Sequence, residues 1–266
     1  MSANFPPVGS SRNGGLGGLA LHSLPSRILK ACEQVGPLFM LFRSEACIFG
    51  TVANPLWFRE TADVHLAASG ALTLNLVPSC PCAIYNYLEA GPGGGFIDAL
   101  EFTTGDRVGF LKLCRMKETN RERWMAMLAE FHSHCVDREW IAGIRKTNHL
   151  YPIIAQDREP SPAETTLMRF FDLVIDAGAL LHVTSQVPVA RSRLAFRPTH
   201  RVDAGNWLVL SAKCTGMHLA PSQITELRVV IRPHVALVVL LGNQGRLIAR
   251  ILTRDPRVLK LLPSIL

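Results

Sequence analysis

The stretch from Met217 to Leu252 constrains the fold of this chain more than any other part of its sequence. It opens with MHLAPSQITELRVVIRP, where apolar and β-branched residues from Ile224 to Val230 lie among polar ones. Pro233 lacks a backbone donor, so this predicted strand should stop there. A second apolar run, Val235 to Leu241, meets turn residues from Gly242 onward and then resumes, which predicts a hairpin. Because a hairpin needs neighbours to cover its apolar face, the chain must supply a larger sheet.

The composition indicates a folded, sheet-rich protein. Of 266 residues, 48% are hydrophobic and 18% are charged, which argues against general disorder. The formal charge of +7 suggests an anionic partner. The apolar run from Val235 is far shorter than the roughly 20 residues that span a bilayer, and the Ser-, Pro- and Gly-rich amino terminus is typical of neither an export signal nor an anchor. Seven cysteines without a regular framework favour reduced thiols. We therefore expect a soluble, cytoplasmic protein.

The remaining chain alternates predicted strands with a few helices. The clearest helix is predicted from Thr119, as its cap, to Phe131, because apolar residues recur there at helical spacing. A short helix is predicted over Ala163 to Phe171. Strands are predicted at 46–52, 64–66, 72–77, 96–102, 108–113, 174–183, 187–191, 207–210 and 225–230.

Two halves of the chain follow the same order of predicted elements. Residues 46–52 match 180–186, residues 70–77 match 205–212, and the hairpin around Gly105 matches the one around Gly245. The members of each pair are separated by a nearly constant number of residues, which indicates a duplicated unit. We therefore predict an α+β fold of two similar halves, each a large antiparallel β-sheet with a few helices, joined by a helical linker. The predicted boundaries are a flexible tail at 1–25, a first repeat at 26–131, the linker at 132–172 and a second repeat at 173–266.

Three short motifs resemble functional sites, but their spacing favours ordinary structure. Cys80-Pro81-Cys82 lacks the spacing of a zinc knuckle or a redox pair. The glycines at 91–95 are not followed by the G-K-[ST] of a phosphate loop, so a hairpin connection is predicted. The His-Ser-His-Cys cluster at 132–135 would need a fourth ligand to bind a metal, and a solvated cluster is the favoured interpretation.

Several longer motifs carry a resemblance to a known family. These are FRSEACIFGTVA, DALEFTTGDRVGFLKL followed by TNRERWMAMLAEF, LLHVTSQVPV, and NWLVLSAKCTGMHL. Their order and spacing resemble the haemin-degrading and haem-trafficking family of the HemS/ChuX type over most of residues 40–255. The resemblance implies a cytoplasmic haem-binding protein of haem uptake and iron acquisition, which carries or stores haem; residual degradation of haem stays open. It implies haem as cofactor, with a haem-uptake transporter or a haem-receiving enzyme as partner.

The resemblance also implies an iron ligand. The family's ligand-bearing motif, a Trp followed by Met-Thr-Asp-x-His-x-Phe-Phe, is matched by REWIAGIRKTNHLYPII with two residues inserted. This alignment gives His149 as the axial ligand and Tyr151 as the aromatic that follows it. A neutral imidazole suits haem iron, although an exposed linker histidine is an equal alternative. His132 is the reserve candidate, since WMAMLAEFH also has the order Trp, Met, His.

The remaining site residues follow from the same alignment. Arginine matches the haem propionates well. Arg232 stands where the family has Lys before Pro, and Arg254 lies next to the family's carboxy-proximal Arg; an exposed, solvated arginine is the alternative for both. Asn75 replaces the family's distal Arg, Val77 its Phe, and Leu252 the aromatic near the ring. Loss of the distal donor argues against degradation but leaves binding open.

Two other functions remain open from the sequence. One is a degenerate family member that acts as a structural or protein-interaction module without haem, which the lost distal side and the short linker suggest. The other is nucleic-acid binding, which rests only on the charge of +7. It is the least favoured, because the arginines are scattered and form no basic run.

Overall fold

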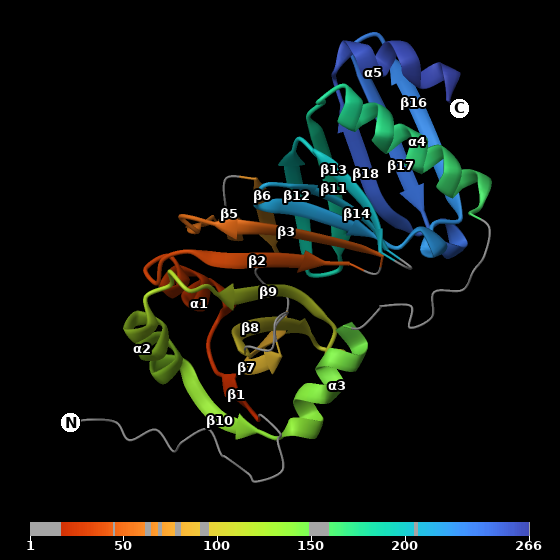
Figure 1. The fold of residues 1–266 in the computed structure, drawn as a ribbon. Helices are drawn as coiled ribbons and strands as arrows, with labels where there is room; N and C mark the ends of the chain where they lie inside the picture. The colour runs from red at the N-terminus through yellow and green to blue at the C-terminus, as the bar shows by residue number, and fades with distance from the viewer. Residues whose placement is uncertain are drawn as a thin grey trace.

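The chain forms two large antiparallel sheets (Figure 1). The computed structural model describes residues 17–44, 46–61, 65–68, 71–77, 81–90, 96–148, 160–204 and 207–265. Within these residues the first sheet has ten strands and the second has eight. The predicted α+β class with two antiparallel sheets is confirmed.

The first sheet has the strand order β10-β1-β7-β8-β9-β2-β3-β15-β14-β13. Its strands are β1 (Gly18–Leu21), β2 (Leu38–Arg43), β3 (Cys47–Ala53), β7 (Cys82–Ala90), β8 (Phe96–Thr104), β9 (Gly109–Arg115), β10 (His132–Val136), β13 (His200–Ala204), β14 (Trp207–Ala212) and β15 (Thr215–Leu219).

The second sheet has the order β16-β17-β18-β11-β12-β6-β5-β4. Its strands are β4 (Trp57–Glu60), β5 (His65–Ala68), β6 (Leu72–Leu76), β11 (Leu181–Val187), β12 (Ala190–Phe196), β16 (Glu226–Arg232), β17 (Val235–Leu241) and β18 (Leu247–Thr253). The predicted hairpin is confirmed as β17 and β18, joined by a short 3₁₀ turn, η2 (Asn243–Gly245), in which Gly245 has a φ of 71°.

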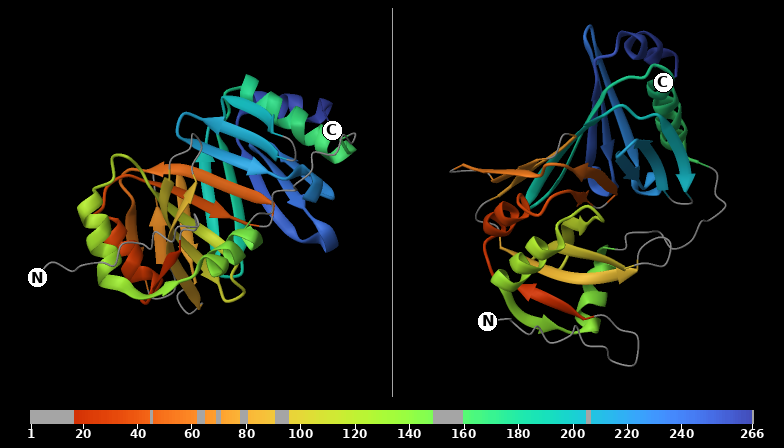
Figure 2. Two further views of the ribbon diagram at one scale, coloured as in Figure 1. Left: turned by 60° about the horizontal axis from the view of Figure 1, so that its bottom comes forward. Right: turned by 60° about the vertical axis from the view of Figure 1, so that its left-hand side comes forward.

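Five α-helices are described, and four of them face the main core. They are α1 (Pro25–Cys32), α2 (Arg121–Phe131), α3 (Arg138–Asn148), α4 (Pro162–Asp176) and α5 (Pro256–Leu261), with single 3₁₀ turns at η1 (Pro221–Gln223) and η3 (Leu262–Ser264). Apolar residues of α1 and α2 pack against the first sheet, and those of α4 and α5 against the second, in one continuous cluster. Figure 2 shows α4 and α5 together on one side of the second sheet.

Local sequence explains where these helices begin. Ser161 and Glu164 form a reciprocal capping box at the start of α4, and Pro162 occupies the first turn, where its missing N–H costs nothing. In α2 the cap is Asn120, whose side chain accepts from the backbone of Arg123 at 3.0 Å. The predicted cap, Thr119, lies one residue before the actual cap, and its hydroxyl donates to the carbonyl of Pro37.

Helix α3 lies on the opposite face of the first sheet. Its Ile141 and Ile144 form a separate small core with Tyr85 and Tyr87 of β7. These tyrosines alternate with the β7 residues that face the main core, so they belong to the other face. Trp140 adds a ring contact to Tyr85, with centroids 4.5 Å apart.

The two sheets exchange strands between the halves of the chain. β13, β14 and β15 come from the second half but extend the first sheet beside β3. β4, β5 and β6 come from the first half but extend the second sheet beside β12. Element for element, the order α1, β2 to β9, α2 is followed later by α4, β11 to β18, α5. Each sheet is therefore built from both halves.

Several details differ from the sequence predictions. Residues 18–21, placed in the flexible tail, form β1 between β7 and β10, because their backbone completes two ladders. Residues 132–136, placed in the helical linker, form β10. Residues 174–176, predicted as strand, end α4, since Val174 continues its buried stripe. In order of elements, β3 corresponds to β12, whereas the sequence alignment matched it to the segment that forms β11.

Candidate functional site

The second sheet has one face covered by α4 and α5 and one open face. Because side chains alternate along a strand, the cross-strand register assigns each residue to one of the two faces. We define the open face by the side chains that point away from the helices: Trp57, Arg59, Thr73, Asn75, His182, Thr184, Gln186, Arg191, Arg193, Glu226, Arg228, Val230, Arg232, Val235, Leu237, Val239, Arg250 and Leu252. Almost all are exposed or half-buried, including Trp57, which is 45% exposed.

Arginines dominate the open face. Arg193 and Arg250 flank Thr184 directly across three neighbouring strands, and Arg191 lies one step further along β12. Arg59, Arg228 and Arg232 occupy the outer strands. Among the described residues of this face, the one acidic side chain is Glu226, which pairs with Arg228 at 2.5 Å. The other open-face arginines form no ion pair with a described residue, so the face has a large excess of positive charge.

The corresponding face of the first sheet is different. There Glu101, which is fully buried, accepts hydrogen bonds from Arg43 Nη1 and the Tyr87 hydroxyl, each at 2.8 Å. Lys112 beside them pairs with Glu89. Burial and the charges of Glu101 and Glu89 raise the pKa of the Tyr87 phenol, so it remains a neutral donor. Charges on this face therefore neutralise one another, whereas those of the open face do not.

One end of the open face holds a compact group of three side chains. Arg193 Nη2 lies 3.0 Å from His182 Nδ1. His182 pairs across the sheet with Leu252, and Arg254 follows two residues later, after the end of β18. Partial burial, then Arg193 and Arg254, lower the pKa of His182 from its usual value. The lowered pKa favours the neutral imidazole at pH 7, because burial and two neighbouring guanidinium groups all disfavour its protonated form.

The structure brings together part of the set of residues predicted from the sequence. Asn75 and Arg232 lie on the open face, and Arg254 stands at its rim near His182. Asn75 is three strands away from β18 and near the opposite end of the strands from Arg254, so the two are not in contact. His132 begins β10 at the far edge of the first sheet, apart from this group. His149 and Tyr151 lie outside the described residues.

The open-face residues that the sequence reasoning missed include His182, Arg191 and Arg193. The segment ARSRLAF does carry a signal, because its arginines alternate with residues that become buried. Nothing local, however, indicates that β12 lies between β6 and β11. Arg193 and His182 meet within the β11–β12 hairpin, and only the neighbours of Arg191 and Arg193 on β6 depend on the strand exchange.

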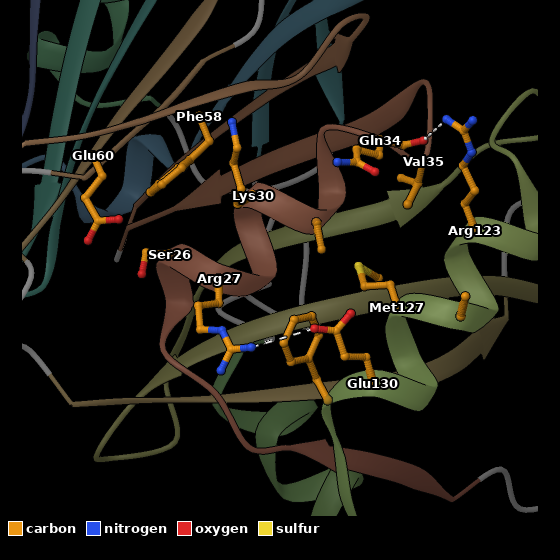
Figure 3. Close-up of a pocket in the computed structure, with 13 residues that line it drawn as sticks. Ser26, Arg27, Lys30, Gln34, Val35, Phe58, Glu60, Arg123, Met127 and Glu130 are labelled. Carbon is orange, nitrogen blue, oxygen red and sulfur yellow. Dashed lines mark hydrogen bonds and ion pairs between the residues drawn. The ribbon is translucent and has the colours of Figure 1, made fainter.

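A separate cavity of about 720 Å³ lies between α1, α2 and β4 (Figure 3). Its cations already have partners: Arg27 pairs with Glu130 at 3.7 Å and Lys30 with Glu33 at 2.5 Å, while Arg123 donates to a backbone carbonyl after α1. This cavity therefore offers an anion less uncompensated charge than the open face does.

Two negative findings apply to the described part of the chain. None of its helices has the length and apolar character needed to cross a membrane. None of its His, Cys, Asp and Glu side chains gather in threes in a way that could hold a metal ion.

Solved structures of other proteins share this fold. ChuS, the haem-degrading enzyme of Escherichia coli O157:H7, superposes with a TM-score of 0.74 at 18% identity, over 93% of this chain and 86% of its own. PhuS in its holo form, a haem-binding protein of Pseudomonas aeruginosa, superposes with a TM-score of 0.71 at 13% identity, over 89% of this chain and 81% of its own. No protein-family model and no curated protein sequence matches the chain. The resemblance drawn from the sequence is thus confirmed at the level of the fold.

Proposed function

We propose that this protein binds haem on the open face of its second sheet and carries or stores it in the cytoplasm as part of haem uptake. The observation that supports this most is the set of open-face arginines without a described acidic partner, beside the apolar side chains of Leu237, Val239 and Leu252. A flat ring with two carboxylates needs such a combination: apolar surface under the ring and guanidinium groups at its edge.

The fold supports the same proposal. ChuS is described as haem-degrading and PhuS as haem-binding, and both share the arrangement of two sheets. In our proposal His149, in the segment after α3, supplies the axial imidazole, and Tyr151 lies against the ring. Arg232 and Arg254 bind propionates, because both stand at the end of the strands where β16 and β18 finish. A haem-uptake transporter or a haem-receiving enzyme is the expected partner.

The side chain at position 75 favours carriage of haem over its degradation. A degrading enzyme must orient oxygen with distal donors, and position 75 is an asparagine with an amide in place of a guanidinium. Arg191 lies directly opposite Asn75 on β12, so a guanidinium is present on the neighbouring strand. We therefore assign carriage as the main role and degradation as residual.

Haemin titration followed by optical spectroscopy tests the proposal. We expect a shifted Soret band that saturates at one haem per chain, and weaker binding with an altered spectrum in His149→Ala. His200→Ala is the matched control, because His200 is exposed on β13 of the other sheet. A spectrum equal to that of free haemin at every ratio would refute haem binding and leave the structural or protein-interaction role.

The open face also supports a second candidate, nucleic acid. The sequence made this the least favoured partner because its arginines are scattered, yet the fold gathers Arg59, Arg191, Arg193 and Arg250 on one face with an exposed Trp57. Phosphate contacts give affinity that falls steeply with salt. Fluorescence anisotropy with a labelled oligonucleotide at 50 and 200 mM salt would decide: absent or salt-insensitive binding would exclude this candidate.

A further inference from the structure

We infer that His182 binds a carboxylate of the bound tetrapyrrole through its Nε2–H, that Arg193 holds the ring in the required tautomer, and that Arg254 supplies the second donor. This inference rests on the proposed function and adds His182 and Arg193 to the residues that would bind the ligand.

The geometry fixes which nitrogen of His182 carries the proton. A guanidinium has only donors, so Arg193 Nη2, at 3.0 Å, must donate to Nδ1. Nδ1 is then unprotonated, and a neutral imidazole keeps its proton on Nε2. A histidine in this state is poorly suited to ligate iron through Nε2, because that atom has no free lone pair. It is well suited to donate a hydrogen bond to an anion.

Charge around His182 points to the same ligand. Arg193 on β12 and Arg254 after β18 lie near the imidazole, and their positive charges add to burial in lowering its pKa. No described acidic side chain pairs with either arginine. An incoming carboxylate would therefore meet two cations and one neutral donor, an arrangement that favours charge-assisted hydrogen bonds.

The surroundings also fit the ring to which the carboxylate is attached. Leu252 lies directly opposite His182, and Leu237 lies opposite Leu252 on the next strand. The donors are thus placed beside apolar surface on the same face of the sheet. A carboxylate on a flat apolar molecule would place its charge at the three donors and its ring over the leucines.

Iron-free protoporphyrin and its dimethyl ester provide the test, since they differ only at the carboxylates and bypass the iron ligand. In fluorescence titrations we expect His182→Leu to weaken binding of the diacid about tenfold or more and to leave binding of the diester unchanged. His182→Gln should keep the affinity for the diacid within about threefold, because its amide nitrogen can replace Nε2 as donor. His200→Leu, on the first sheet, is the control that should change neither ligand.

Arg193 is a positioning residue, so its test must follow the histidine itself. Nitrogen-15 NMR of the His182 imidazole should show the Nε2–H tautomer in the wild type and a mixture of tautomers in Arg193→Leu. An Nδ1–H tautomer in the wild type would overturn the inference. So would equal loss of diacid and diester, or no loss of diacid, in His182→Leu.

The outcomes separate this inference from the proposed function. If the wild type binds haemin and the diacid but His182→Leu binds them equally well, only the role of His182 is wrong. If the wild type binds no porphyrin at all, the proposed function fails and the inference fails with it.

Discussion

Asn75 on β6 and Arg191 on β12 lie directly opposite each other on the open face of the second sheet, joined across the ladder that links the two halves of the chain. The asparagine occupies the place where the sequence comparison expected an arginine, and the neighbouring strand presents one. Cross-strand neighbours have Cβ atoms about 5 Å apart, so the guanidinium of Arg191 can reach over position 75.

Arg191→Gln should therefore weaken haemin binding about fivefold, which is the expected size for one exposed charge-assisted contact of about 1 kcal/mol. The measurement is a haemin titration at fixed salt. Arg228→Gln is the matched control, because Arg228 lies on the same face but is already neutralised by Glu226. An equal loss in both variants would mean that general charge, and no particular contact, holds the ligand.

The buried ion network of the first sheet predicts a large effect on stability. Glu101→Gln removes the charge that Arg43 Nη1 and the Tyr87 hydroxyl contact, and leaves the half-buried guanidinium of Arg43 without its counter-charge. We expect a loss of about 3 kcal/mol in the free energy of unfolding, at the lower end of the range for broken buried pairs because Arg43 is partly exposed. Urea unfolding with an unchanged m-value would measure it. Glu122→Gln, exposed on α2, should change stability by less than about 0.5 kcal/mol.

Stability should depend on pH through His218. Burial lowers the pKa of His218 from its usual value, so the unfolded chain binds its proton more readily than the folded one. The contribution of His218 to the free energy of unfolding is then fully present above the usual histidine pKa of about 6.5. It falls as the pH drops below that value, because the unfolded state takes up protons first. Urea midpoints at pH 7.5, 6.5 and 5.5 should decline less steeply in His218→Gln than in the wild type. Parallel slopes would contradict the assignment.

The cysteines should divide by reactivity. Cys135 and Cys214 are exposed, whereas Cys32 and Cys47 are fully buried. Burial raises the pKa of the Cys32 thiol to about 12, and that of Cys47 in the same direction, so neither forms thiolate at pH 8. Brief iodoacetamide treatment followed by peptide mass spectrometry should find label on the exposed pair and none on the buried pair. Labelling all four in urea is the control for detection.

Local sequence predicted the elements well where a proline or turn residues mark their ends. Pro233 and the turn after Leu241 bound the β16, β17 and β18 strands, and the helix predicted to Phe131 is present as α2. Val174 was misassigned because a short apolar run suits a strand or a buried helix, and only its packing against the second sheet distinguishes them.

The site could be predicted only in part, because its residues come from strands far apart in the chain. Arg59, Arg193 and Arg228 look like scattered surface charges in the sequence, yet they share one face across the second sheet. Their common orientation depends on pairing β6 with β12, a contact between residues more than 100 positions apart. Such long-range register leaves no local signature, so the shared face of Arg59 and Arg193 could not be foreseen. The hydrogen bond between Arg193 and His182, by contrast, lies within the β11–β12 hairpin.

Because each half contributes three strands to the sheet of the other, the two halves depend on each other for their folding. Separating the halves would remove β15 from β3 and β6 from β12, and would leave these four strands with edges whose backbone amides have no partner. Neither half should therefore fold when it is expressed alone. After cleavage of the connection before α4, the two fragments should still elute together in size-exclusion chromatography. A binding surface built from strands of both halves exists only while both halves remain folded.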